Sequence, residues 1–147
     1  MSGDPMAKRR GAGKAAILIV DDHEAMRAVL RQFVQQVFPR CAVHEAADGA
    51  QALEQSVALR PHLVLMDIRL PDANGIELTA RIRSMLPDTE VIVVSCLDGP
   101  PYVERALAAG ACAFVAKDRL HRELLPAMKS ALGTPWSAND SRAAQAL

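Results

Sequence analysis

Residues 16–22 read Ala-Ile-Leu-Ile-Val-Asp-Asp, an apolar run that ends in two acidic side chains. A second run of this kind, Leu63–Met66, ends in Asp67. Short runs that are apolar at every position are typical of strands buried on both faces, as in a parallel sheet between two layers of helices. The two runs therefore predict buried parallel strands with carboxylates at their carboxyl ends.

The rest of the chain repeats this plan. Five short runs predict strands, with the bounds Ala16–Val20, Ala42–Ala46, Leu63–Met66, Val91–Ser95 and Ala111–Ala116. Each run is followed by a segment whose apolar residues recur three and four positions apart, as along one face of a helix. The predicted inward-facing residues are Met26, Val29, Leu30, Phe33 and Val37, then Ala50, Leu53 and Val57, then Leu78, Ile82 and Met85, then Val103, Ala106 and Leu107, and last Leu120, Leu124, Met128 and Ala131. This alternation predicts an α/β fold with a doubly wound parallel sheet.

Individual residues mark the ends of these elements. Asp48 is predicted to cap the second helix and Asp118 the fifth, because a carboxylate at a helix start accepts hydrogen bonds from free backbone amides. Gly110 is predicted to supply the left-handed conformation that ends the fourth helix. The second strand contains His44 and Glu45, so we expect it at an edge of the sheet.

Composition limits the class of protein. The chain has 147 residues, of which 50% are hydrophobic and 23% charged, which predicts one globular domain. We place this domain at residues 15–133, with a flexible basic tail at 1–14 and a linker or C-terminal tail at 134–147. Lys and Arg number 17 and balance 17 Asp and Glu, so the chain has no net positive field of the kind that binds nucleic acid.

The lengths of the apolar runs and the cysteines indicate the cellular compartment of the protein. No apolar run approaches the roughly 20 residues that a membrane span needs. Three cysteines, with no C-x-x-C pair, indicate neither a disulfide framework nor a zinc site. We therefore expect the protein in the reducing cytoplasm.

Chemistry is expected at one edge of the sheet, since function in open parallel sheets gathers beyond the carboxyl ends of the strands. The predicted strands end there in Asp21-Asp22, Asp67, Ser95 and Lys117. Asp21 and Asp22 alone would be an acidic first turn of a helix, and Lys117 alone a solvated surface residue. Together these residues favour a site, because clustered carboxylates need a cation and an all-oxygen donor set suits Mg²⁺.

Asp67 is the predicted nucleophile of this site. A carboxylate beside Mg²⁺ and an ammonium group can attack phosphorus, as in enzymes that form aspartyl phosphate. Lys117 and the cation would stabilise charge on the phosphoryl oxygens, and Ser95 could donate a hydrogen bond to one of them.

Several motifs resemble the receiver domain of bacterial two-component response regulators over all of residues 15–133. They are Leu18-Ile19-Val20-Asp21-Asp22, Leu65-Met66-Asp67-Ile68-Arg69-Leu70-Pro71, Gly75, Val94-Ser95 and Ala109-Gly110-Ala111 with Phe114-Val115-Ala116-Lys117-Asp118. Many receivers have a proline after the lysine, whereas Asp118 stands there in this chain. Together with Asp98, Tyr102 and Val103, this makes the chain most similar to the NarL/FixJ (LuxR-type) subfamily.

The resemblance implies a flavodoxin-like or CheY-like three-layer fold with sheet order 2-1-3-4-5. It also implies that a sensor histidine kinase, or a small phosphodonor, passes a phosphoryl group to Asp67. Mg²⁺ would be held by Asp22, Asp67 and the main-chain carbonyl of Arg69, with Asp21 assisting through water.

By the same resemblance, Ser95 and Lys117 would contact the phosphoryl group. Phe114 would occupy the aromatic switch position and turn inward when Ser95 moves, although an ordinary core aromatic is an equally good interpretation.

The output is left open by the sequence. Subfamily members usually carry a C-terminal helix-turn-helix that binds DNA, so this chain would be either a receiver cut within the linker or a single-domain regulator. A homodimer or another partner could use the surface of the fourth helix, fifth strand and fifth helix. Apart from phosphorylating and slowly dephosphorylating itself, the domain would turn over no substrate.

The sequence leaves two other functions as alternatives. The first is a receiver-like module that binds partners without phosphorylation. The second is a phosphatase of the haloacid-dehalogenase type, which needs an acid where Arg69 stands.

The residues around the predicted phosphoryl site suggest a control on its lifetime. Leu97 and Cys96 are predicted to limit the approach of water, and Arg69 to add an ion pair at the rim. Cys96 is otherwise interpreted as a small apolar filler. The histidines share no metal-ligand spacing and are assigned no role; they are His23, His44, His62 and His121.

Overall fold

A computed structural model describes residues 15–133 of the chain. The predicted basic tail at 1–14 and the predicted linker at 134–147 lie outside the described residues. None of the helices within 15–133 combines the length and hydropathy that a membrane crossing requires.

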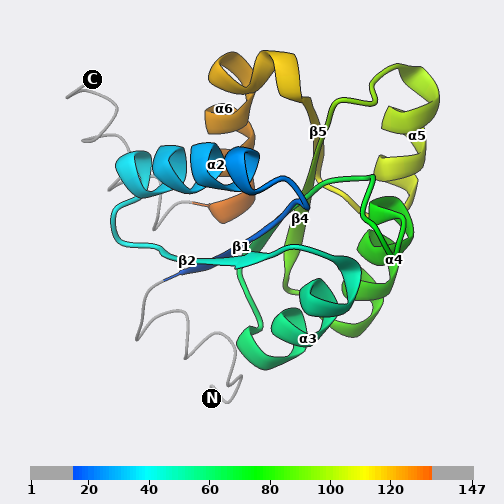
Figure 1. The fold of residues 1–147 in the computed structure, drawn as a ribbon, viewed down its shortest axis with the longest axis horizontal. Coiled ribbons are helices and arrows are strands. Elements are labelled where there is room, and N and C mark those ends of the chain that lie inside the picture. Colours follow the sequence, from blue (N-terminus) through cyan, green and yellow to red (C-terminus); the bar gives the residue numbers. More distant parts are fainter. Residues whose placement is uncertain (1–14, 134–147) are drawn as a thin grey trace.

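The described chain forms one parallel sheet of five strands in the order β2-β1-β3-β4-β5 (Figure 1). The strands are β1 (Ala16–Val20), β2 (Ala42–Ala46), β3 (Leu63–Met66), β4 (Glu90–Ser95) and β5 (Ala113–Ala116). The predicted strand order, the parallel pairing and the edge position of β2 are confirmed.

Two strand starts differ from the prediction. β4 begins one residue earlier, at Glu90, whose amide bonds to His62 O at 3.0 Å. β5 begins two residues later than Ala111, because the Ala111 amide bonds to Ala106 O at 3.0 Å. Ala111 is therefore part of the turn that leaves the preceding helix, although its apolar side chain matches the strand pattern.

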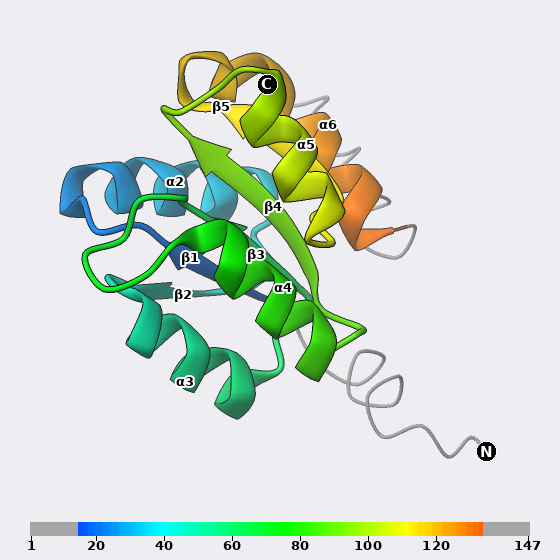
Figure 2. The same cartoon turned by 90° about the vertical axis from the view of Figure 1, so that its right-hand side faces the viewer.

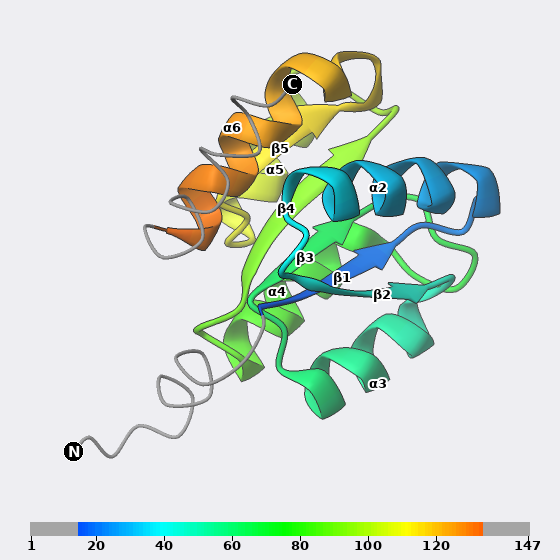
Figure 3. The ribbon, with the colours of Figure 1, turned by 90° about the vertical axis from the view of Figure 1, so that its left-hand side faces the viewer.

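Helices cover both faces of the sheet, giving three layers (Figures 2 and 3). On one face lie α2 (Glu24–Val37) and α6 (Leu120–Leu132), which share a buried cluster with one side of the strands. On the other face lie α3 (Gly49–Leu59), α4 (Gly75–Met85) and α5 (Pro100–Ala108). A 3₁₀ turn, η1 (Lys117–Arg119), joins β5 to α6.

The predicted inward faces of four helices are partly wrong. The exposed fractions are 54% for Val29, 55% for Val57, 45% for Met85 and 47% for Leu107. Ala50 is exposed as well. The spacing of apolar residues does not decide which of two adjacent helix faces is buried when both faces contain apolar residues. Packing against the sheet decides it.

In helix α3 the buried face is not the one with the largest apolar side chains. Its buried residues are small: Gly49, Ala52 and Ser56. They bring the helix backbone close to the sheet, so the bulkier Val57 lies on the solvent side. In α2 the buried residues are Leu30, Val34 and Val37.

Two of the three predicted helix ends are confirmed. Asp48 caps α3, where its Oδ1 accepts from the Gln51 amide at 2.8 Å, and Gly110 has φ +109° after α5. The cap predicted at Asp118 is wrong. Because η1 runs directly into α6, Asp118 lies inside the turn and Arg119 precedes the helix without a side-chain cap.

Candidate functional site

Three carboxylates meet where β1 and β3 end. These strands are neighbours in the sheet, and the Asp67 amide extends their ladder by donating to Val20 O at 3.0 Å. Asp21 and Asp67 are buried, with 1% and 5% of their surface exposed. The Asp22 side chain keeps 34% of its surface exposed. The structure thus brings these three predicted site residues together at the open edge of the sheet.

Lys117 reaches the same place from the end of β5. Its Nζ lies 2.8 Å from Asp21 Oδ2 and 3.3 Å from Asp67 Oδ2. Burial by itself lowers the pKa of Lys117, but the hydrogen bond to Asp21 and the nearby charges raise it above its ordinary value. Lys117 is therefore a fixed positive charge between two buried carboxylates.

The environment of Asp67 disfavours its charged form. Burial raises the pKa of Asp67, and the neighbouring Asp21 charge adds to this, while Lys117 opposes it. One oxygen, Oδ1, accepts the Ile68 amide at 2.8 Å. Three carboxylates beside one ammonium leave an excess of negative charge, and this donor set fits a hard divalent cation.

Both oxygens of Asp21 are engaged, and so are both oxygens of Asp67. In Asp21, Oδ1 accepts the His23 amide at 2.9 Å, and Oδ2 accepts from Lys117. Its backbone carbonyl also accepts from Arg27 Nη1 at 2.7 Å. Lys117 lies nearer to Asp21, at 2.8 Å, than to Asp67, at 3.3 Å, and the Asp22 side chain is 34% exposed. Asp22 and Asp67 are therefore better placed than Asp21 to offer an oxygen to a cation.

Ser95 and Arg69 border this cluster. Ser95 ends β4, the strand beside β3, and is 1% exposed, with its Oγ accepting from the Leu97 amide at 3.1 Å. The Arg69 side chain is exposed, while its backbone pairs with Asn74. Leu97 is half-buried. The interpretation of Cys96 as a small apolar filler is wrong, because this side chain is exposed to solvent.

The loop after Asp67 is fixed by contacts that the sequence analysis did not find. A Cβ on Gly75 would lie 1.9 Å from Asp67 O, so only glycine allows this approach, and the Gly75 amide donates to Ile68 O at 2.7 Å. Asp72 accepts from the Gly49 and Ala50 amides at 2.7 and 3.0 Å. These hydrogen bonds tie the loop to the start of α3.

Asp72 and Asn74 both cap helices, but only one of these caps could be predicted from the sequence. The hydrogen bonds from Gly49 and Ala50 lower the pKa of Asp72. No local pattern predicts that cap, because its partners lie 22 and 23 positions away. Asn74 is different: its Oδ1 accepts from the Ile76 amide at 2.8 Å at the start of α4, a local cap that residue type and position could have indicated.

His23 is the residue that sequence reasoning missed at the cluster. Its Nδ1 lies 3.3 Å from Asp21 Oδ1 and 3.2 Å from Asp22 Oδ1. One donor atom from each of Asp21, Asp22, His23 and Asp67 lies within 4.8 Å of all the others, a group that could hold a metal ion. Its place directly after two predicted ligands was the available signal, and the sequence analysis assigned it no role.

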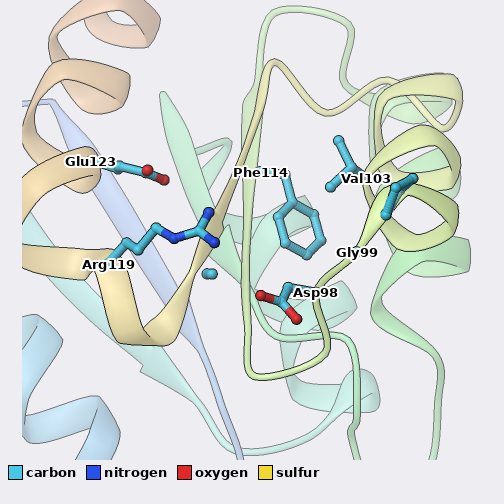
Figure 4. Close-up of a pocket in the computed structure, with 8 residues that line it drawn as sticks. Asp98, Gly99, Val103, Phe114, Arg119 and Glu123 are labelled. Carbon is cyan, nitrogen blue, oxygen red and sulfur yellow. The ribbon is translucent and has the colours of Figure 1, made fainter.

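Phe114 lies on β5 beside a pocket of about 430 Å³ (Figure 4). The half-buried ring packs against a small cluster that includes Ile68 and Val93. In Figure 4 it lies between Arg119 and Val103, with Asp98 beyond its edge. The pocket therefore separates the start of α5 from the start of α6.

Known proteins resemble this chain in sequence and fold. Residues 17–129 match the family model described as the response regulator receiver domain. The chain belongs to this family. A curated relative, the DNA-binding transcriptional activator DevR/DosR of Mycobacterium tuberculosis, is 36% identical over 131 residues, covering 89% of this chain and 60% of that protein.

Solved receiver structures agree with the fold. A LuxR-family two-component response regulator from Aurantimonas sp. SI85-9A1 has a TM-score of 0.75 and 32% identity, covering 82% of this chain and 86% of that one. The receiver domain of the putative response regulator NarL from Mycobacterium tuberculosis has a TM-score of 0.68 and 33% identity, with coverage of 83% and 99%. The resemblance to two-component response regulators of the LuxR/NarL type is confirmed.

The curated relatives are longer than this receiver chain. It spans 60% of DevR/DosR and 54% of the transcriptional activator ExaE of Pseudomonas putida. Both relatives are named as transcriptional activators.

Proposed function

We propose that this receiver domain is a phosphoryl-accepting switch and that Asp67 is the acceptor. One observation carries the proposal: Lys117 Nζ lies 3.3 Å from Asp67 Oδ2 and 2.8 Å from Asp21 Oδ2, which puts a fixed positive charge beside a buried carboxylate. The cluster lies at the carboxyl edge of the sheet, where the Asp22 side chain keeps 34% of its surface exposed.

The residues present fit Mg²⁺. Asp22 and Asp67 would supply carboxylate oxygens and Arg69 its main-chain carbonyl, while Asp21, the carboxylate nearer to Lys117, would assist through water. When bound, the cation supplies neutralisation of charge on the phosphoryl oxygens.

In the transfer step, an Asp67 carboxylate oxygen forms a bond to phosphorus as the bond between phosphorus and the kinase histidine nitrogen breaks. The electron pair of that bond returns to the imidazole of the kinase. Lys117 and Ser95 then donate to phosphoryl oxygens, and these contacts favour the acyl phosphate once it has formed. The only reactions are this transfer and a slow hydrolysis, so no external substrate is turned over.

The response proposed for the rest of the domain starts at Ser95. Its hydroxyl exchanges the Leu97 amide for a phosphoryl oxygen, the loop after β4 moves, and Phe114 turns inward beside it. These movements alter the surface formed by α5, β5 and α6. A homodimer or another partner binds this surface, and a DNA-binding segment of the kind that the name of DevR/DosR indicates acts on transcription in the cytoplasm.

The test is incubation with acetyl phosphate or phosphoramidate, with and without Mg²⁺, followed by intact mass. We expect a gain of about 80 Da that requires both Mg²⁺ and Asp67, with Asp67→Asn as the control. A folded protein that gains no mass under any condition would support instead the module that binds partners without phosphorylation.

A further inference from the structure

His23 extends the acidic cluster with a nitrogen donor. It follows Asp21 and Asp22 directly and precedes the first residue of α2. Its imidazole is 73% exposed, so it lies at the mouth of the cluster rather than within the core. The Nδ1 atom is directed at the carboxylates, 3.3 Å from Asp21 Oδ1 and 3.2 Å from Asp22 Oδ1.

These separations suit donor atoms that share one cation. Ligands at roughly 2.0–2.2 Å from a metal lie about 3 Å from one another around a tetrahedral or octahedral centre. The donor atoms of Asp21, Asp22, His23 and Asp67 lie within 4.8 Å of one another, close enough for one ion to reach several of them.

We propose that His23 Nδ1 is a direct ligand of the cation and makes this site favour a divalent first-row transition metal such as Mn²⁺ over Mg²⁺. The inference rests on the cation site of the proposed function. Imidazole nitrogen is a softer donor than carboxylate, carbonyl or water oxygen, which Mg²⁺ prefers. An added nitrogen therefore strengthens binding of a transition metal and does little for Mg²⁺.

The local backbone makes substitution of His23 a mild structural change. The hydrogen bond to Asp21 Oδ1 comes from the His23 main-chain amide, which any residue retains. The His23 side chain makes no capping hydrogen bond to α2. Arg27 Nη1 also holds Asp21 O at 2.7 Å independently of the imidazole. His23→Ala is therefore expected to fold and to keep its carboxylates in place.

Binding of Mn²⁺ and Mg²⁺ to wild type and His23→Ala provides the test. The titrations are made at pH 8, above the ordinary imidazole pKa of about 6.5. Electron paramagnetic resonance measures free Mn²⁺, and binding of Mg²⁺ is measured by its displacement of bound Mn²⁺. His121→Ala is the matched control, because this exposed histidine of α6 is outside the cluster. Mn²⁺ is the chosen probe because Cys96 and Cys112 are exposed and thiolates bind softer metals.

We expect His23→Ala to raise the Kd for Mn²⁺ about tenfold and to change the Kd for Mg²⁺ less than twofold. Pulsed resonance of bound Mn²⁺ should show ¹⁴N coupling from a directly bound imidazole in wild type and in His121→Ala. That coupling should be absent in His23→Ala, an effect that a merely structural role would not produce.

Other outcomes separate this inference from the proposed function. Mn²⁺ binding without ¹⁴N coupling, or equal effects of His23→Ala on both cations, would overturn the role of His23 and leave phosphorylation of Asp67 standing. Wild type that binds neither cation would overturn both. A coupled ¹⁴N signal in a protein whose Asp67 cannot be phosphorylated would support the metal assignment and overturn the switch.

Discussion

Lys117 Nζ lies 2.8 Å from Asp21 Oδ2, although 96 positions separate the two residues in the chain. The side chains are 9% and 1% exposed, so this is a buried ion pair. Lys117 also lies 3.3 Å from Asp67 Oδ2 and thus joins the ends of β1, β3 and β5. Removing the ammonium group would leave two buried carboxylates facing each other.

We expect Lys117→Met to lower the free energy of unfolding by about 2 kcal/mol at neutral pH, because buried carboxylates lose their compensating charge. Urea unfolding measures this change. A saturating divalent cation should restore part of the loss, since it supplies the missing positive charge. Unchanged stability without a cation would show that Lys117 does not compensate these acids.

Whereas Lys117→Met should lower the free energy of unfolding, Asp67→Asn should raise it. Burial and the Asp21 charge disfavour the Asp67 carboxylate, as its raised pKa indicates, and an amide of the same shape carries no charge. We expect a gain in stability on the order of 1 kcal/mol together with complete loss of phosphorylation. Chemical unfolding in EDTA checks the gain, and a less stable variant would contradict it.

The ion pairs of Glu45 should make the free energy of unfolding depend on pH. It accepts from Arg31 Nε and from Arg27 Nε, the latter at 2.9 Å. The Arg31 hydrogen bond is the largest effect that lowers the pKa of Glu45, and the Arg27 bond adds to it against the cost of burial.

Because the folded-state pKa is below the unfolded one, this stabilisation is present above the ordinary pKa and is lost as pH falls through the folded value. We expect Glu45→Gln to cost about 0.5–1 kcal/mol at pH 7. As pH falls through the folded-state pKa of Glu45, the difference in stability between wild type and variant should shrink towards zero. A difference that persists below that pKa would mean that the carboxylate charge is not its cause.

Gly75→Ala tests the close approach behind Asp67. The added Cβ would lie 1.9 Å from Asp67 O, a backbone atom that cannot move without displacing the acceptor loop. We expect a loss of about 3 kcal/mol and slower phosphorylation.

Gly49→Ala is the comparison for Gly75→Ala, because its nearest contacts are side-chain atoms of Ala73 and Leu78. Its loss should be smaller, since the added Cβ would lie 2.7 Å from Ala73 Cβ, a less severe overlap than 1.9 Å from Asp67 O. Thermal unfolding and the mass assay compare the two variants, and equal losses would argue against a special role for the Asp67 carbonyl.

Leu97→Asn tests protection of the acyl phosphate. Leu97 is half-buried next to Ser95, where an apolar side chain would exclude water and an amide would admit it. We expect the half-life of the phosphorylated protein to fall several-fold, measured as decay of the mass gain. Arg69→Ala is expected to shorten it less, because the exposed Arg69 acts only at the rim. Unchanged half-lives in both variants would end this hypothesis.

The sequence by itself determined the strands and the residues that end them. Runs such as Ile17–Val20 and Leu63–Met66 are apolar at every position, and only burial on both faces favours that composition. In a parallel sheet the carboxyl ends share one edge, so Asp21, Asp67 and Lys117 were predicted to meet without knowledge of their distances. The cap at Asp48 was also predictable, because its partner is three positions away.

Tertiary structure decided what depends on neighbours that are distant in the chain. Val29 and Val57 match a buried stripe in sequence, yet packing against the sheet left them exposed. Asp72 caps α3 from another loop, and His23 joins the acids only because β1 and α2 direct its Nδ1 toward them. The physical reason is the same in each case: local periodicity fixes which residue types suit an element, whereas the face that is buried and the group that is bonded depend on free energies of contact between elements.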